Sequence, residues 1–353
     1  MSLVSYKCPN CGGGLQFDPK TQKFTCEYCA SEFTEEDMKK MEAAQNKEET
    51  ASPAEEESGK EGQEAVVYTC PSCGAEIVTD DTTASTFCYY CHNPIVLSGR
   101  LSGKYLPDYV IPFAMDKKEA TEKFLDWIKK KKYVPNDFFS KEQIEKFSGI
   151  YFPYLLYNCN VDGAIRAETE KNRSWTTGNI RYTEHKQYQV ERQGCLEVKN
   201  LTRNALSTSN KELVEGVLPF DMNKTQPFRM GYLSGFQAEK RDMESDSFTA
   251  EAEQEVQEYA LQSLKDSISG YDNVRLLASD TKIRDAGWKY ALLPVWILTY
   301  QDKVRNQVYY FAMNGQSGKI WGRLPIDKKK LMLLFAKISL PIFAVLMIGG
   351  WFL

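Results

Sequence analysis

The sequence predicts an α+β protein in three parts, and three observations carry this prediction. Eight of the ten cysteines fall into two quartets with the same internal spacing near the start of the chain. Two apolar motifs occur twice, in the same order, in the part that follows. The last 23 residues, 331–353, are mostly apolar. We therefore expect cysteine-rich modules, then a body of helices and strands, then an apolar helix.

Each cysteine quartet has the ligand spacing of a zinc ribbon, with two CxxC pairs separated by fourteen residues. One CxxC turn supplies two sulfurs to a tetrahedral ion, and a hairpin brings back the second pair. The first turn of each quartet reads Cys-Pro-x-Cys-Gly, in which glycine lets backbone N–H groups approach the sulfurs. We expect two structural zinc ions, bound by Cys8, Cys11, Cys26 and Cys29 and by Cys70, Cys73, Cys88 and Cys91.

Two other interpretations of the quartets use the same residues. An iron–sulfur cluster also takes four thiolates, whereas a disulfide framework needs an oxidising compartment. The first seven residues show no secretory signal, so we expect free thiols in a reducing cytoplasm. Some zinc ribbons bind nucleic acid, some contact other proteins, and some only close a fold. The metal alone therefore does not define a function.

The net charge of −4 argues against a general nucleic-acid binder, because such proteins carry a basic stripe that neutralises phosphates. Neither ribbon has such a stripe. In the first ribbon three lysines are matched by three carboxylates, and the second carries three carboxylates of its own. We therefore expect protein partners rather than nucleic acid, and no small-molecule substrate.

Composition divides the chain into six segments. The residues between the two ribbons are rich in Glu, Lys, Ala and Ser, so they cannot bury enough apolar surface to fold, apart from a short helix capped by Thr34. The expected order is zinc ribbon 1 (1–33), acidic flexible linker (34–65), zinc ribbon 2 (66–100), α+β module A (105–209), α+β module B (210–325) and a C-terminal transmembrane anchor (331–353).

The two α+β modules are inferred from paired motifs. The run Val-Ile-Pro-Phe at 110–113 is echoed by Val-Leu-Pro-Phe at 217–220, and the apolar run at 151–157 is echoed at 292–298. Because both motifs occur in the same order, the sequence predicts a duplicated α+β body with antiparallel sheets. Chance similarity between short apolar runs is the alternative.

Module A contains clear helix and strand signals. Asp116 and Glu119 form a capping box before an apolar helical face, and a second short helix is expected at 140–149. The apolar run 150–157 predicts a buried strand. Alternating polar and apolar residues at 182–201 predict strands with one polar face.

Module B is expected to contain a long amphipathic helix at about 248–269, because apolar side chains recur there in helical register. Gly270 marks its end. Three strands should follow as a meander, at 293–300, 307–313 and 319–324.

Residues 331–353 predict one transmembrane helix. At about 1.5 Å per residue they would span roughly 35 Å, enough for the hydrocarbon core of a bilayer. Three lysines at 328–330 precede the segment, so the positive-inside rule predicts a single-pass protein of the inner (cytoplasmic) membrane with its N-terminal bulk in the cytoplasm. Lys337 can snorkel and Pro341 would kink the helix, so a buried or interfacial helix is the alternative.

The sequence shows no catalytic constellation, and we expect a protein that is not an enzyme. His92 follows a cysteine of the second quartet, and His185 lies on an expected strand without a nucleophile partner. Cys159 and Cys195 lie on expected strands, where cysteine usually serves as a small buried hydrophobe. The Gly-x-x-x-x-Gly-Lys-Ser/Thr loop that holds ATP phosphates does not occur.

Three motifs together resemble a known bacterial family. They are the Cys-Pro-x-Cys-Gly turns, the Ile-Tyr-Phe-Pro run at 150–153 and the Tyr-Leu-Ser-Gly-Phe-Gln-Ala-Glu run at 232–239. From residue 68 to about 325 the chain resembles the TFIIB-type zinc-ribbon-containing proteins, which are often labelled PriA-like or primosomal helicase-like. It departs from that pattern at Arg241-Asp242, where Tyr-Asp is expected, and in its two ribbons.

Family members that end in a membrane helix are similar to a component of envelope-stress gene clusters, which also encode SPFH (flotillin-like) and phage-shock-type proteins. The resemblance therefore implies a membrane-anchored, cytoplasm-facing adaptor that recruits such protein partners. Two alternatives stay open: a nucleic-acid-binding regulator that uses its ribbons as readers, and an enzyme with a site between the two body modules.

Overall fold

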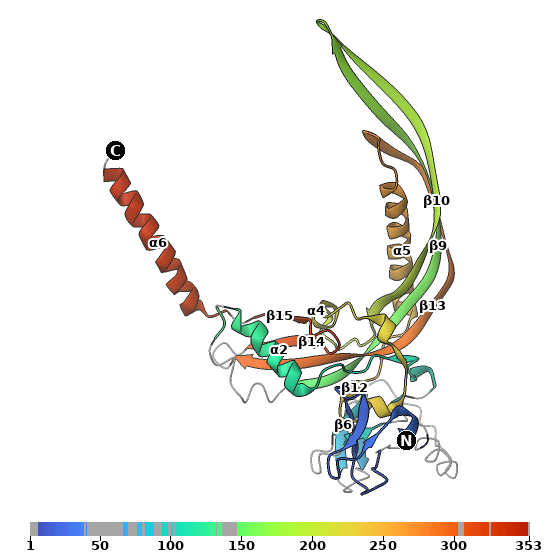
Figure 1. Ribbon diagram of the computed structural model, residues 1–353, viewed down its shortest axis with the longest axis vertical. Helices are drawn as coiled ribbons and strands as arrows, with labels where there is room; N and C mark the ends of the chain where they lie inside the picture. Colours follow the sequence, from blue (N-terminus) through green and yellow to red (C-terminus); the bar gives the residue numbers. More distant parts are fainter. Residues whose placement is uncertain are drawn as a thin grey trace. The chain divides into compact units, whose positions relative to one another are not determined.

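The computed structural model describes residues 6–38, 40, 66–69, 76–79, 82–87, 94–97, 100–101, 103–131, 133–135, 147–302, 307–324 and 326–351. Helices and strands mix along the chain and the sheets are antiparallel or mixed, which confirms the α+β class (Figure 1). The residues divide into two compact units. Unit 1 takes its residues from Met1–Phe152, Thr208–Lys240 and Leu292–Leu353, and unit 2 consists of Pro153–Ser207 and Arg241–Ala291.

The two units do not coincide with the modules expected at 105–209 and 210–325. Each unit takes residues from both modules, because strands β9 (Ser148–Thr177) and β13 (Asn273–Asp302) each run from one unit into the other. The echoed apolar runs lie on these two strands, which are neighbours in one sheet. The duplication itself stays a prediction.

Unit 1 begins with a small three-stranded antiparallel sheet. Strand β1 (Leu15–Asp18) pairs with β2 (Lys23–Cys26), which pairs with β3 (Glu32–Phe33). Thr34 then caps a helical turn, as expected, through its hydroxyl and the Asp37 backbone N–H, 3.4 Å apart. Residues 41–65, most of the expected linker, lie outside the described residues.

The main sheet of unit 1 includes the meander expected near the end of the chain. Strand β13 pairs with β14 (Gln307–Asn314), and β14 pairs with β15 (Ile320–Gly322), both antiparallel. The strand order β11-β8-β13-β9-β12-β6-β7 continues the sheet. The other strands are β6 (Thr83–Phe87), β7 (Pro94–Val96), β8 (Tyr109–Val110), β11 (Gln226–Pro227) and β12 (Gln237–Glu239).

Helix α2 (Lys117–Lys129) begins where the capping box predicts. The Asp116 carboxylate accepts a 2.8 Å hydrogen bond from the Glu119 backbone N–H, which satisfies a free donor of the first turn. Phe124 is buried and contacts Phe311 of β14 with ring centres 5.8 Å apart. Of the second helix expected at 140–149, residues 140–146 lie outside the described residues, and β9 starts at Ser148.

Unit 2 consists of the β9–β10 hairpin, part of β13 and one helix. Strand β10 (Ile180–Asn204) pairs with β9 along almost its whole length, and Gly178 takes the positive φ of 60° that the turn requires. Helix α5 (Asp246–Asp266) lies along one face of these strands (Figure 1). The strands expected at 182–201 and the helix expected at 248–269 are confirmed.

The core of unit 2 forms where the two-residue period of strand β9 meets the apolar face of helix α5. Alternate residues of β9 point toward α5, and α5 turns Ala252, Val256 and Ala260 toward them. The Trp288 indole N–H of β13 also donates to the Thr249 hydroxyl of α5 at 3.1 Å. Two buried clusters result, formed by Tyr157, Cys159, Val161, Ala252, Val256 and Ala260 and by Ile165, Ala167, Val190 and Ile268.

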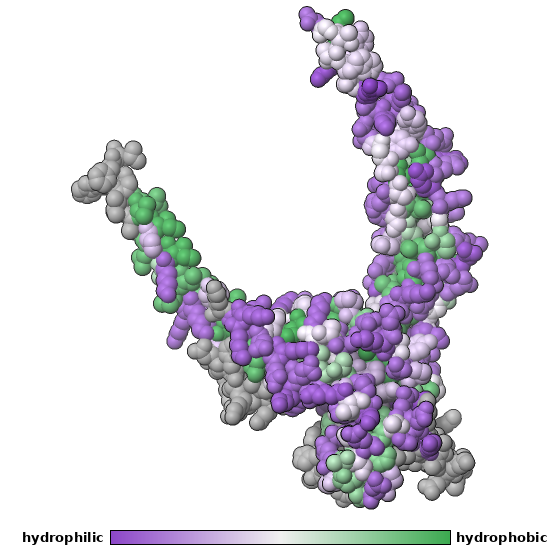
Figure 2. Space-filling model, in the orientation of Figure 1, coloured by the Kyte–Doolittle hydropathy of each residue, from purple (hydrophilic) through white to green (hydrophobic). Residues whose placement is uncertain are grey.

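Helix α6 (Lys328–Trp351) is long and apolar enough to cross a membrane. Apolar residues cover much of the side of this helix that Figure 2 shows, and none of the window 328–347 is buried in the structure. Such a surface fits a bilayer, and a buried or interfacial helix stays the alternative to a membrane span. Residues 352–353 lie outside the described residues.

A glycine pair makes room for α5. Gly163 and Gly194 lie opposite each other on β9 and β10, and a Cβ at Gly163 would lie 2.9 Å from Leu264 Cδ1. A Cβ at Gly194 would lie 3.6 Å from Leu264 Cδ2. The glycines thus let the Leu264 side chain lie directly on the strands.

Gly163→Val should therefore lower the free energy of unfolding of unit 2 by about 1 to 3 kcal/mol through overpacking. Gly287→Val is the matched control, because nothing lies within 4 Å of a Cβ there. Thermal unfolding of the full chain in detergent, followed by the loss of helical circular dichroism, compares the two variants. Equal stability in both would contradict the close packing of Leu264.

Candidate metal centre

The first cysteine quartet forms one cluster in unit 1. The sulfurs of Cys8, Cys11, Cys26 and Cys29 all lie within 4.8 Å of one another. Cys8 Sγ is 3.6 Å from Cys29 Sγ, and Cys11 Sγ is 3.4 Å from Cys26 Sγ. A tetrahedral ion with metal–sulfur bonds of about 2.3 Å would hold its sulfurs about 3.8 Å apart. The four residues fit that arrangement and could hold a metal ion.

Two tight turns present these cysteines. In the first, the Gly12 N–H donates to the Cys8 carbonyl at 2.8 Å, and in the second the Ala30 N–H donates to the Cys26 carbonyl at 2.9 Å. Gly12 has a φ of 75° and Ala30 a φ of 54°. The second turn therefore carries a backbone strain of roughly 1 to 2 kcal/mol that the first avoids by using glycine.

Ser31 prepares one of the four thiols for binding. Its hydroxyl lies 3.1 Å from Cys29 Sγ. Hydrogen bonds from this hydroxyl and then from the Ser31 backbone N–H lower the pKa of Cys29 to about 6. The thiolate is the form that binds metal, so these hydrogen bonds favour the ligand form of Cys29.

The cluster is attached to the body through residues 229–239, which we call the hub segment. The Ser234 carbonyl accepts a 2.9 Å hydrogen bond from the Phe17 N–H, and the Ser234 hydroxyl donates to the Leu15 carbonyl. Both partners belong to β1. Ribbon 1 is therefore held to the hub segment by one backbone hydrogen bond and one side-chain hydrogen bond.

An aromatic cluster reinforces this attachment. The Tyr232 ring centre lies 5.3 Å from that of Phe17 and 6.1 Å from that of Phe24. All three rings are buried, and such burial stabilises by about 1.5 to 3 kcal/mol for a side chain of this size. A Cβ at Gly231 would lie 3.1 Å from Phe24, so glycine lets the hub segment approach the ribbon closely.

The other side of the hub segment joins the core of unit 1. The Phe236 ring stacks on Phe113 at 4.2 Å, and the buried Ser85 hydroxyl of β6 donates to the Phe236 carbonyl at 2.8 Å. Strand β12, at the end of the hub segment, pairs with β9 and β6. The hub segment therefore links ribbon 1, the main sheet and a strand of the expected ribbon 2. In the sequence, most of this stretch stands out only as part of the Tyr-Leu-Ser-Gly-Phe-Gln-Ala-Glu family motif at 232–239.

Ion pairs occupy basic side chains around the ribbon. Lys23 lies 2.7 Å from Glu32, and Lys20 lies 2.8 Å from Asp116 at the start of α2. These lysines are thus paired with carboxylates of the protein, whereas a nucleic-acid-binding protein would use such lysines to contact phosphates.

Among the described residues, the other candidates from the sequence do not join this cluster. Cys70, Cys73, Cys88, Cys91 and His92 lie outside the described residues. In unit 2, Cys159 is buried under α5 and Cys195 is exposed. His185 Nδ1 lies 2.6 Å from Asn172 Oδ1 across the hairpin.

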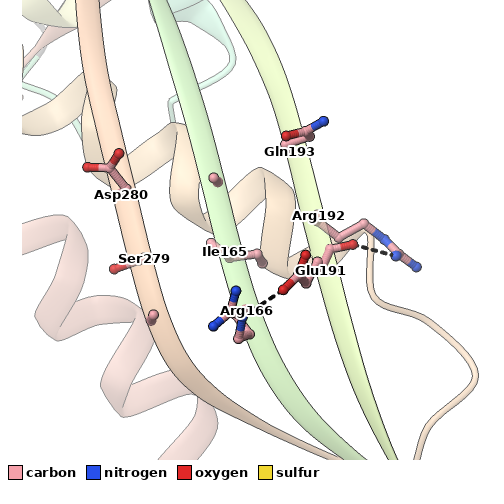
Figure 3. A pocket seen from close by; sticks show the side chains of 9 residues that line it. Ile165, Arg166, Glu191, Arg192, Gln193, Ser279 and Asp280 are labelled. Atoms are coloured by element: carbon pink, nitrogen blue, oxygen red, sulfur yellow. Dashed lines mark hydrogen bonds and ion pairs between the residues drawn. The ribbon is translucent and has the colours of Figure 1, made fainter.

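Unit 2 carries a shallow polar groove of about 430 Å³ on the β9–β10–β13 strands (Figure 3). Arg166 and Glu191 line it and already form an ion pair at 2.7 Å. None of the lining residues that the structure describes is a cysteine or histidine. The ion pair in this groove joins β9 to β10 across the hairpin.

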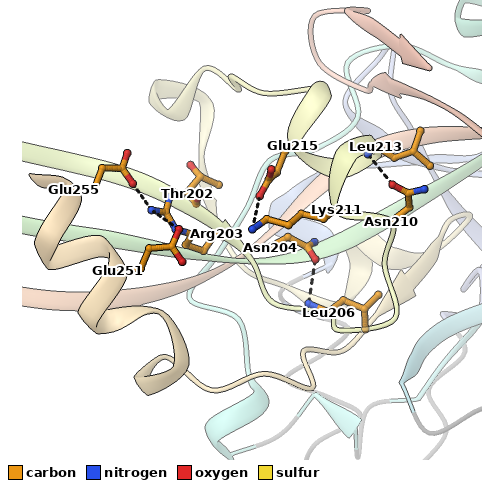
Figure 4. A network of polar contacts seen from close by, with 10 residues as sticks. All are labelled: Thr202, Arg203, Asn204, Leu206, Asn210, Lys211, Leu213, Glu215, Glu251 and Glu255. Atoms are coloured by element: carbon orange, nitrogen blue, oxygen red, sulfur yellow. Dashed lines mark hydrogen bonds and ion pairs between the residues drawn. The ribbon is translucent and has the colours of Figure 1, made fainter. Parts of the chain in front are cut away.

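A polar network along β10 also has a structural role (Figure 4). Arg203 of β10 pairs with Glu255 of α5 and lies 3.8 Å from Glu251, which ties the helix to the strand. In unit 1, the Asn210 side chain caps helix α4 (Lys211–Gly216) by accepting from the Leu213 N–H at 3.3 Å.

The chain is similar to a protein of Bacillus subtilis (strain 168) that bears the name uncharacterized protein YdjG. The two are 30% identical over 355 residues, which cover 99% of this chain and 100% of the relative. No family model matches the sequence, and no solved structure matches it. The similarity spans the ribbon, the hub segment and α6.

Ser234→Ala should speed amide hydrogen exchange in β1, because the Leu15 carbonyl stays buried without its partner. A loss of about 1 to 3 kcal/mol of local unfolding free energy is expected. Mass spectrometry of peptides that cover 15–18 measures the exchange. Ser279→Ala, on the exposed surface of β13, is the control. Identical exchange in both variants would show that the Ser234 hydroxyl does not hold the ribbon.

Proposed function

The chain belongs to the family of the Bacillus subtilis protein YdjG, and we propose that it is a membrane-anchored, cytoplasm-facing adaptor whose zinc ribbons recruit protein partners. The observation that carries this proposal is a single chain that combines a four-cysteine cluster built into its body with an unburied apolar helix near its C-terminus. The first feature suits a rigid contact surface, and the second suits attachment to a bilayer.

Zinc is the proposed metal, with one ion in each ribbon. Four thiolates in a closed tetrahedron leave no open coordination position, which is typical of structural rather than catalytic zinc. Binding of about 10 to 16 kcal/mol would stabilise a hairpin that is too small to fold alone. Cys70, Cys73, Cys88 and Cys91 are proposed to bind the second ion by the same spacing.

The proposed contact surface of ribbon 1 includes Tyr28, which lies between two ligands of the cluster. Its side chain is 72% exposed, although the ring lies against Gly13, where a Cβ would be 2.5 Å away. An aromatic side chain held by a metal turn loses little entropy on binding, and tyrosine is common among residues that dominate protein interfaces.

Helix α6 is proposed to span the inner membrane, with Lys328, Lys329 and Lys330 on the cytoplasmic side. SPFH (flotillin-like) or phage-shock-type proteins are the proposed partners, as the family resemblance implies. The ion pairs of Lys20 and Lys23 favour a protein partner over nucleic acid for ribbon 1.

The full chain, purified in detergent, is expected to contain two zinc ions by elemental analysis. Cys8→Ser should leave one, because three thiols hold the ion too weakly. Cys195→Ser, an exposed cysteine outside the quartets, should keep both. All three proteins should resist extraction of membranes with alkaline carbonate. Bound iron in place of zinc, or release of Cys8→Ser from membranes, would contradict the proposal.

Affinity capture from detergent-solubilised native membranes tests recruitment. Tyr28→Ala should keep its zinc but capture SPFH or phage-shock-type proteins at a yield at least about tenfold lower, as expected for an interface anchor. Tyr259→Ala is the control, because Tyr259 is 64% exposed on α5. Undiminished capture by Tyr28→Ala would remove Tyr28 from the contact surface. Capture that nuclease abolishes would favour the nucleic-acid alternative instead.

A further inference from the structure

The end of the β9–β10 hairpin, residues 171–186, carries an uncovered aromatic pair; we call these residues the hairpin tip. Trp175 and Tyr182 lie directly opposite each other, with their rings stacked at 5.7 Å and 14°. Each is 44% exposed, and nearby Ile180 is 59% exposed. Aromatic and aliphatic side chains of this size are usually buried.

These three residues continue the face of the hairpin that α5 covers. Along β9 the covered face includes Ile165 and Ala167, and steps of two residues lead from there to Trp175. Ile180 and Tyr182 pair with Thr177 and Trp175, so they share that face. The packing on this face continues past Ile268 to Tyr271, whose ring centre lies 5.6 Å from that of Tyr188, the residue opposite Thr169. In the described part of the chain, the face beyond that point is therefore open.

The hairpin tip is also locally basic in an acidic chain. The net charge of the whole chain is −4, whereas the tip carries one carboxylate, Glu184, against four cations. Arg173 extends over Trp175, with its guanidinium carbon 5.9 Å from the ring centre. The end of the hairpin is mainly pale where its sides are purple (Figure 2). The four cations are Lys171, Arg173, Arg181 and Lys186.

We propose that the hairpin tip binds the surface of an anionic bilayer. Trp and Tyr prefer the headgroup region, where an apolar ring and a polar edge are both satisfied. Ile180 would enter the acyl boundary, and Arg173 and Arg181 would lie against lipid phosphates. The stacked pair is already formed, so binding orders little that was free. This contact is separate from α6, so the chain would have a second segment that binds lipid.

Single-stranded nucleic acid also binds aromatic platforms with nearby cations. The tip favours lipid because Ile180, its most exposed large apolar side chain, cannot stack on bases. An apolar helix elsewhere in the same chain also fits a bilayer.

Hydrogen exchange of the full chain in lipid nanodiscs tests this proposal. One disc contains phosphatidylcholine alone, and the other contains phosphatidylcholine with phosphatidylglycerol. Amides of the hairpin tip should exchange several-fold more slowly in the anionic disc. Co-elution of the chain with the neutral disc reports insertion of α6 separately, so failure of the anchor and failure of the tip contact are distinguishable.

Two variants separate charge from apolar contact. Arg173→Glu with Arg181→Glu should abolish the lipid-dependent protection, since each cation near an anionic surface contributes about fivefold in affinity. Trp175→Ser with Tyr182→Ser should weaken it as well, and Tyr259→Ala should leave it intact. Unchanged exchange of peptides covering 159–167 shows that unit 2 stays folded in each variant.

Equal exchange of the tip in both discs would overturn the proposal. Protection that persists after the double charge reversal would do the same, as would slower exchange with a single-stranded oligonucleotide but not with anionic lipid. The last result would assign the tip to nucleic acid.

Discussion

The contact between Ser234 and β1 is the interaction on which the arrangement of unit 1 depends. It joins the ribbon to the hub segment through a backbone hydrogen bond and a side-chain hydrogen bond, and Ser234 is buried. The same short segment places Tyr232 against the ribbon's rings and Phe236 in the core of the main sheet. Because an unpaired buried carbonyl is expensive, the ribbon and the body are energetically coupled.

This coupling changes what a metal ion would do in the molecule. An ion bound by the four cysteines would fix two turns, and one of them directly follows β2, the partner of β1. An ordered β1 would in turn hold the hub segment, and β12 at its end, in their folded conformation. A ribbon built into the body in this way presents its exposed turn at a defined place. A mobile ribbon would instead have to lose its freedom whenever a partner bound.

Local features of the fold could be predicted from the sequence, and long-range ones could not. The cysteine spacing, the capping box at Asp116 and the amphipathic pattern of α5 all act within a few turns or one hairpin. The hub contact joins Ser234 to Leu15 across 219 positions, and no periodicity reports such a pairing. Strand β9 was predicted only at its apolar start, although residues 158–170 alternate between buried and less buried positions as a half-buried strand does. Its last residues, 171–177, are all exposed and carry no such signal.

A metal ion bound by the four cysteines of ribbon 1 should stabilise the hub segment as well as the ribbon. The most direct measurement is hydrogen exchange at residues 231–239 of the full chain, before and after the metal is removed by a chelator. We expect faster exchange in the hub segment as well as in β1 once the metal is removed, while exchange of the unit 2 hairpin at 159–167 is unchanged. Faster exchange in the ribbon alone, with the hub segment still fully protected, would contradict it.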